Sequence, residues 1–167
     1  MSRKTRLQQR LRVEALSWLW YFLTDLQTGL LEQLTSSIGY DDEATVTFNG
    51  SKIIYISMVS GDLDIWTMDS DWPNKKQITN NEAANFGLYY YPTSDKIIFS
   101  SNLHDPKWRD FDLYSINIDG SGLERITFFN GFDGFPMFSP NGEHTVFASN
   151  RNIKKKKDTS FFSRMEL

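Results

Sequence analysis

The chain has 167 residues, of which 40% are hydrophobic and 23% are charged; this excludes a wholly disordered chain and predicts one globular domain. The absence of cysteine from the sequence excludes a disulfide framework, a thiolate zinc site and a cysteine nucleophile. The formal net charge is −3, with basic residues gathered near both ends and an acidic segment between them. Because such a segment repels phosphate, we expect no nucleic-acid partner.

The first 19 residues are predicted to form a basic N-terminal extension. Leu7, Leu11 and Leu16 lie near a helical spacing, so we expect a short helix or a disordered segment. The pattern is a convincing match neither to a secretory signal peptide nor to a mitochondrial presequence. The apolar run Ala15–Leu23 is too short for a transmembrane segment.

Three copies of one sequence pattern occupy residues 20–152. The segments EQLT, KQIT and ERIT end at equivalent threonines, and 12 residues later the segments TFNGSKIIYIS, YPTSDKIIFSS and SPNGEHTVFAS begin. The interval from Tyr55 to Phe99 is 44 residues, and that from Phe99 to Phe147 is 48. The additional residues fall around Asn102–Asp110, and an insertion confined to one place indicates a loop.

Each copy is predicted to form four short strands separated by turns. Residues 140–142 (PNG) and 49–50 (NG) are typical turn residues. Ile53–Ile56 and Ile97–Phe99 are apolar at every position, as in strands buried on both faces. Four antiparallel strands in a unit of this length form a blade of a β-propeller, so the predicted fold class is all-β. In the second copy the strands are expected at residues 88–91, 96–101, 112–117 and 124–127.

The two ends of the repeat region match complementary halves of a unit. Residues 20–25 and 31–35 match the last two strands, and residues 136–149 match the first two. The sum is about three blades, fewer than the roughly four to eight of closed propellers, so we expect an open or incomplete propeller. Apolar segments at its open edges, such as Ile53–Ile56 and Val146–Ala148, predict self-association or binding of a partner.

Two segments depart from the regular pattern. The loop Ser70–Lys76 lacks the glycine expected of a hairpin, and we interpret it as a place near which a blade is missing. Residues 153–167 are interpreted as a basic C-terminal tail with a candidate last strand. Within it, Lys154–Lys157 is expected to be a solvated loop or tail rather than a localisation signal or an anionic-surface contact.

A turn motif connects these repeats to known proteins. The sequence serine-proline-asparagine-glycine stands intact at Ser139–Gly142, Thr47–Gly50 keeps its second half, and Tyr91–Ser94 has lost the asparagine and glycine. The motif lies within the longer runs GYDDEATVTFNGSKIIYIS, SGDLDIWTMD, DFDLYSINIDGSGLERIT and FDGFPMFSPNGEHTVFASNRN. On these residues the segment 20–152 resembles the TolB-like, WD-repeat-like β-propeller family. The resemblance implies a periplasmic or secreted location and a longer propeller, so we expect a truncated or recombined member.

This resemblance specifies a fold more than a function, because such propellers serve many roles. Our leading hypothesis is a non-enzymatic module that binds a protein partner. The alternative is a propeller fragment or accessory domain of a prolyl-oligopeptidase-like peptidase or another hydrolase, since similar propellers precede the catalytic domain of such peptidases. A G-x-S-x-G elbow and a phosphate-binding glycine loop are absent from the sequence. We therefore expect no catalytic residue, no cofactor and no enzyme activity.

Pairs of carboxylates recur before the third strand of a unit, as Asp62 with Asp64 and Asp110 with Asp112. Two acids spaced by two on a strand face the same side, and they could bind calcium or a cationic partner. We favour the alternative in which one acid of each pair accepts hydrogen bonds from a neighbouring turn or backbone amide and the other is solvated.

Other polar residues are expected to be structural. One equivalent position, six residues before the turn, is occupied by Asp41, Asn85 and Asp133. The two histidines, His104 and His144, occupy nonequivalent positions of the repeat. We therefore expect them to be surface loop residues and predict no metal site.

Overall fold

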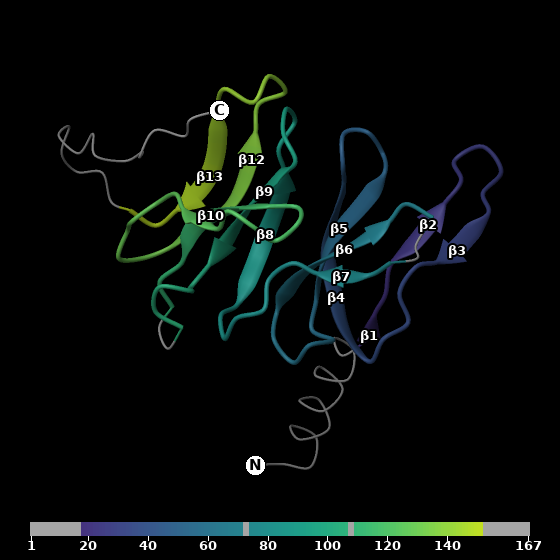
Figure 1. Ribbon diagram of the computed structural model, residues 1–167, viewed down its shortest axis with the longest axis horizontal. Coiled ribbons are helices and arrows are strands. Elements are labelled where there is room, and N and C mark those ends of the chain that lie inside the picture. The colour runs from purple at the N-terminus through teal and green to yellow at the C-terminus, as the bar shows by residue number, and fades with distance from the viewer. Residues whose placement is uncertain (1–17, 72–73, 107–108, 152–167) are drawn as a thin grey trace, which may run out of the picture.

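The computed structural model describes residues 18–71, 74–106 and 109–151 (Figure 1). Every regular element in these ranges is a β-strand, which confirms the all-β prediction, and they contain no helix that could span a membrane. The expectations for residues 1–17 and 153–167 lie outside the described residues. The strands are β1 (Trp18–Leu19), β2 (Phe22–Thr24), β3 (Leu31–Gln33), β4 (Gly39–Val46), β5 (Lys52–Ser57), β6 (Asp64–Asp69), β7 (Lys76–Gln77), β8 (Asn85–Tyr90), β9 (Lys96–Ser101), β10 (Asp112–Asn117), β11 (Glu124–Arg125), β12 (Asp133–Phe138) and β13 (Thr145–Ser149).

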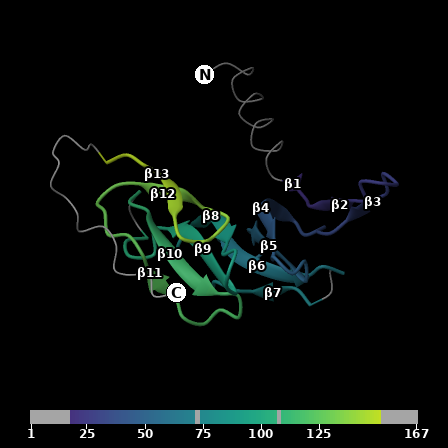
Figure 2. The same ribbon diagram turned by 90° about the horizontal axis from the view of Figure 1, so that it is seen from above.

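Two complete antiparallel sheets form the centre of the fold. One contains β4, β5, β6 and β7 in chain order, with β1 added parallel to the outer side of β4, and the other contains β8, β9, β10 and β11. They lie side by side in two views of the molecule (Figures 1 and 2). These sheets are the predicted four-stranded units.

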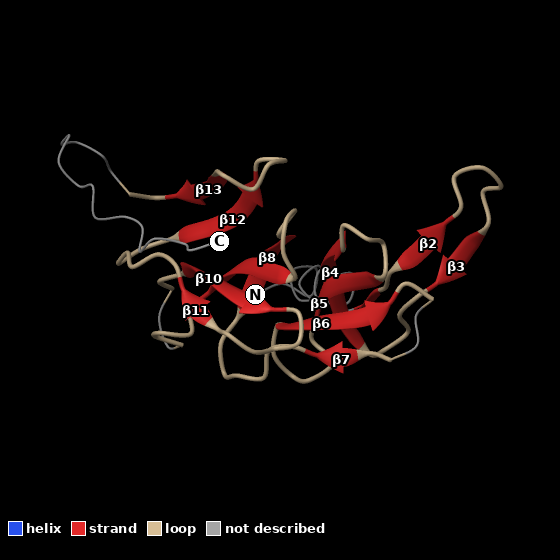
Figure 3. Cartoon of the chain, turned by 45° about the horizontal axis from the view of Figure 1, so that its top comes forward, coloured by secondary structure: helices blue, strands red, loops and turns tan. Residues whose placement is uncertain are grey.

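A two-stranded hairpin lies at each end of this arrangement, β2–β3 at one end and β12–β13 at the other (Figure 3). Their residues match the predicted half-units. The register of β2 with β3, where Phe22 faces Gln33, repeats that of β6 with β7 and of β10 with β11. The described strands therefore form two blades and two half-blades, and the sheets do not close into a ring.

The first strand of each unit carries the same β-bulge. The pairing register shifts after Asp42 in β4, after Phe86 in β8 and after Gly134 in β12. The residue that follows each has a positive φ: 53° at Glu43, 64° at Gly87 and 55° at Phe135. A bulge bends the strand and increases its twist.

Two expected strand boundaries were wrong because backbone geometry overrides the apolar pattern. β8 begins at Asn85 and not at Leu88, since the bulge carries the pairing past Gly87. β11 ends at Arg125 and not at Thr127, because the N–H groups of Ile126 and Thr127 both donate to the carbonyl of Leu113.

The loop Ser70–Lys76, near which a missing blade is predicted, connects two strands of a complete blade. β6 and β7, on either side of this loop, pair directly within one sheet. Asn74 adopts a φ of 60° and so takes the left-handed conformation for which a glycine was expected; asparagine tolerates it better than most residues.

The hydrophobic core lies between neighbouring sheets. Ile54 and Ile56 of β5 pack in one cluster with β8 and β9, whereas Ile53 and Tyr55 face the β2–β3 hairpin with Leu34 and Met68. Ile53–Ile56 are therefore buried, with at most 6% of each residue exposed, and the expectation that they form an exposed edge was wrong. The same expectation was correct for Val146, which is 69% exposed.

Candidate functional site

A buried hydrogen-bond network ties the first complete blade to the second. The hydroxyl of Thr79 donates to Oδ1 of Asp64 at 2.8 Å and accepts the N–H of Ile65 at 2.9 Å. Nδ2 of Asn85, in the next blade, donates to the same carboxylate at 3.4 Å. The hydroxyl of Ser101 donates to Oδ1 of Asn85 at 2.8 Å, so the network spans both sheets.

The second complete blade repeats this network around Asp112, which is fully buried. Its Oδ1 accepts hydrogen bonds from the hydroxyl of Thr127 at 3.0 Å and the N–H of Phe129 at 2.9 Å. The guanidinium of Arg125 is bound to Oδ2. In the following half-blade, Asp133 accepts from the hydroxyl of Ser149 at 2.6 Å and is paired with Arg151.

The recurrent carboxylate pairs are thus divided between core and surface. Asp64 and Asp112 are buried in the networks, whereas Asp62 is exposed and Asp110 is partly exposed. The ranges that the structure describes contain no group of three or more His, Asp or Glu side chains able to hold a metal ion.

The two histidines lie in different surroundings. Nδ1 of His104 is 3.5 Å from Oδ2 of Asp112, and its side chain is only 19% exposed. His144 lies beside the turn at Asn141 and is exposed. The proximity of His104 to the network could not be predicted from the sequence, because the insertion loop that carries it has no counterpart in the other units.

At the junction with the first half-blade the network is incomplete. Thr35 accepts the N–H of Tyr21 at 2.9 Å, as its equivalents do, but Trp20 occupies the position of the acid. Asp41 is 5% exposed, and its Oδ2 has no hydrogen-bond partner among the described residues, nor have the hydroxyl of Tyr21 and Nε1 of Trp66. Burial, followed by the carboxylates of Asp42 and Asp41, raises the pKa of Tyr21, which keeps the phenol protonated.

The bulge residue Glu43 links two blades through its carboxylate. Its Oε2 accepts hydrogen bonds from the N–H groups of Gly87 and Leu88, the latter at 3.2 Å. Burial raises the pKa of Glu43, and the hydrogen bonds from Leu88 and Gly87 oppose that rise. The sequence gives no sign of this contact, because it joins residues in two different repeats.

Replacement of Glu43 by glutamine is expected to remove a pH dependence of stability. Because the folded pKa lies above the ordinary value of 4.5, the folded chain holds this proton more tightly than the unfolded chain. The resulting stability is present below pH 4.5 and is lost as pH rises through the folded pKa. The free energy of unfolding of the wild type minus that of Glu43→Gln, measured in urea, should therefore fall as the pH rises above 4.5. The exposed Glu143→Gln serves as the control, and an equal or rising difference for Glu43 would contradict the assignment.

Four phenylalanines from three strand regions meet at one end of the sheets. The ring of Phe86 lies 4.9 Å from that of Phe111 and 5.5 Å from that of Phe135, measured between centroids. Phe132 lies within 6.2 Å of all three. A Cβ on Gly134 would come within 2.5 Å of the Phe132 ring, so the glycine makes room for it. Phe135 is 53% exposed; we call these four residues the phenylalanine cluster.

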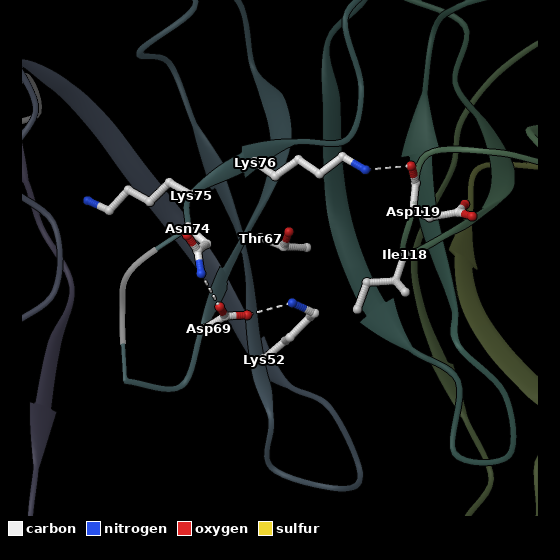
Figure 4. A pocket seen from close by; sticks show the side chains of 8 residues that line it. All are labelled: Lys52, Thr67, Asp69, Asn74, Lys75, Lys76, Ile118 and Asp119. Carbon is white, nitrogen blue, oxygen red and sulfur yellow. Dashed lines mark hydrogen bonds and ion pairs between the residues drawn. The ribbon is translucent and has the colours of Figure 1, made fainter.

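A cavity of about 540 Å³ lies at the opposite end, between the β6–β7 and β10–β11 loops (Figure 4). Nζ of Lys52 is 2.6 Å from Oδ1 of Asp69, whose other oxygen accepts from Asn74 at 2.8 Å. Nζ of Lys76 donates to the carbonyl of Asp119 at 2.9 Å. The hydrogen bond from Lys52 contributes most to lowering the pKa of Asp69. The lining residues are Lys52, Thr67, Asp69, Asn74, Lys75, Lys76, Ile118 and Asp119.

Repeated four-stranded sheets, each with the same buried hydrogen bond from a threonine to an aspartate, define a β-propeller segment. The TolB homolog of Chlorobium chlorochromatii is 33% identical over 140 residues, covering 61% of this chain and 32% of that protein. The Tol-Pal system protein TolB of Wolinella succinogenes is 30% identical over 139 residues, covering 80% of this chain and 32% of that protein. The chain spans about a third of the length of these curated relatives. No family model matches it.

Solved structures show the same fold. A protein designated TolB from Agrobacterium tumefaciens superposes with a TM-score of 0.66 at 23% identity, covering 78% of this chain and 50% of that one. TolB from Acinetobacter baumannii gives 0.64 at 22% identity, covering 77% and 31%. An oligogalacturonate lyase in complex with manganese gives 0.61 at 14% identity, covering 78% and 36%. With the sequence relatives, these structures show that the repeats of this chain are TolB-like β-propeller repeats.

Proposed function

We propose that the chain is a non-enzymatic propeller module that binds a protein segment on the phenylalanine cluster. The observation that carries the proposal is the half-exposed ring of Phe135 on top of three further phenylalanines. Aromatic side chains held by their neighbours lose little conformational freedom on binding and dominate the energetics of protein interfaces. The designation of one relative as a Tol-Pal system protein supports a partner that is itself a protein.

The cavity at the other end is a weaker candidate for this role. Two of its three lysines already bind groups of this chain, Lys52 to Asp69 and Lys76 to the carbonyl of Asp119. A ligand would have to replace these contacts. The phenylalanine cluster offers apolar surface that remains open.

The alternative function, a segment of a hydrolase, has one supporting observation, the fold shared with oligogalacturonate lyase. At 14% identity that likeness describes the fold alone. Under this alternative the phenylalanine cluster would contact a catalytic domain, and free peptides would not bind to it.

Phe135→Asn tests the proposed surface, because asparagine tolerates the positive φ of this position. Peptides selected from a displayed random library on the wild-type chain should lose at least about 30-fold in affinity for the variant, as at an interface hot spot of about 2 kcal/mol. Fluorescence anisotropy gives the dissociation constants.

Phe48→Asn is the matched control, since Phe48 is 85% exposed in the β4–β5 turn at the other end of the sheet. It should leave affinity for the selected peptides unchanged. The proposal fails if no selected peptide discriminates the wild type from Phe135→Asn, or if Phe48→Asn weakens binding as much.

A further inference from the structure

The two half-blades leave uncovered the repeat positions that the complete blades bury. Ile54 and Ile98 are both 0% exposed, but Val146 at the same position of the third copy is 69% exposed. Tyr114 is 4% exposed, but its equivalent Phe22 is 48% exposed. Among the described residues β2 pairs only with β3, and β13 only with β12. Within the described ranges each hairpin therefore has a free edge and an apolar surface.

The two hairpins already have the internal geometry of a complete blade. β12 and β13 pair with Asp133 opposite Ser149, as β8 and β9 pair with Asn85 opposite Ser101. In both hairpins the bulge begins after the next residue of the first strand. β2 and β3 keep the register of the last two strands. The pairing between the second and third strands is the one that is missing.

We propose that β13 of one copy of this chain pairs antiparallel with β2 of a second copy and completes a four-stranded composite blade. The register follows from the complete blades, where Ser57 faces Asp64 and Ser101 faces Asp112. The equivalent pair is Ser149 with Trp20, which places Val146 opposite Leu23. Leu23 is 44% exposed in the single chain, so this pairing covers apolar surface on both strands.

The number of blades in closed propellers favours a ring made of two copies of this chain. The described part of each chain supplies two complete blades and both halves of another. Closure of one copy on itself gives about three blades and three copies give about nine, outside the roughly four to eight of known propellers, while two copies give about six. A head-to-tail interface that closes after two copies forms a ring, whereas one that does not close forms a filament.

Disulfide trapping tests this register, because the natural chain has no cysteine. The N–H of Ser70 donates to the carbonyl of Ser51, so positions 54 and 67 face each other in a non-hydrogen-bonded pair, and Val146 and Leu23 are their equivalents. Opposite residues in such a pair have Cα atoms about 4.5 Å apart, within the range that a disulfide bridges.

Equal amounts of Leu23→Cys and Val146→Cys chains, mixed and oxidised, should form a covalent pair of one chain of each kind. The doubly substituted chain Leu23→Cys/Val146→Cys should stop at a covalent dimer. The control is Leu23→Cys with Phe147→Cys, since the neighbouring residue points to the other face of the sheet and should cross-link at least tenfold more slowly.

Three results would overturn the proposal. The first is that the control pair cross-links as fast as the matched pair. The second is that oxidation gives a ladder of higher covalent oligomers. The third is that light scattering and oxidation both show only single chains at every concentration. Circular dichroism of the single variants, compared with the wild type, establishes that they fold. The result of this cross-linking test does not depend on whether the phenylalanine cluster binds a peptide.

Discussion

Asp112→Ala is expected to lower the free energy of unfolding by about 3 kcal/mol, because it removes the carboxylate that accepts hydrogen bonds from a partly buried guanidinium and a buried hydroxyl. Asp112 is 0% exposed and accepts hydrogen bonds from Thr127, Phe129 and Arg125. Urea unfolding followed by tryptophan fluorescence measures the change in midpoint and slope.

Asp62→Ala provides the matched comparison for Asp112→Ala. Asp62 precedes Asp64 just as Asp110 precedes Asp112, and it is exposed. Its substitution should change the free energy of unfolding by no more than about 0.5 kcal/mol. Equal effects of the two substitutions would show that the buried network around Asp112 does not stabilise the fold.

The second large effect is expected for Phe99→Ala, at about 3 to 5 kcal/mol. Phe99 is 0% exposed in the cluster between the two complete sheets, and its ring lies 6.0 Å from that of Tyr114. Truncation removes apolar contacts and leaves a cavity that the surrounding strands close only in part.

The control is Phe48→Ala, which removes the same group from a residue that is 85% exposed. Its effect on the free energy of unfolding should be within about 0.5 kcal/mol. If Phe99→Ala lowered the free energy of unfolding as little as Phe48→Ala does, in urea or in thermal unfolding, packing between the sheets would not be a main source of stability.

The sequence was sufficient to predict the strands because the pattern that marks them is local and repeated. β9 and β10 have the expected bounds, Lys96–Ser101 and Asp112–Asn117. The half-units at the two ends were also predicted, because their strands keep the same spacing from the equivalent threonines of the three copies. Repetition supplies three observations of each position.

Features that join different repeats could not be predicted in this way. The contact of Glu43 with the N–H groups of Gly87 and Leu88 depends on how the bulges of two blades face each other. The phenylalanine cluster likewise assembles Phe86, Phe111 and Phe132 from segments that have no common periodicity. These are the places where tertiary packing, rather than local pattern, decides the surroundings of a side chain.

The burial of Ile53–Ile56 has a similar physical origin. The blade count along the sequence makes the blade of this strand a terminal one, and a terminal blade is expected to have no neighbour that covers its apolar residues. In the structure the β2–β3 hairpin supplies Tyr21 and Leu34 to one face of β5. Half a blade is therefore enough to cover its neighbour, while its own outer surface stays open.

Hydrogen exchange at the amides of Tyr55, Phe99 and Phe147 tests the central claim that one repeated strand is completed in two blades and open in the third. The register directs all three N–H groups toward the third strand of a blade, which β6 and β10 supply to the first two. In dilute solution Tyr55 and Phe99 should exchange only through global unfolding, and Phe147 should exchange fast. Protection of Phe147 should then rise with protein concentration as β2 of a second copy pairs with it. Fast exchange at Tyr55 or Phe99, or a Phe147 amide that stays unprotected at every concentration, would contradict the account.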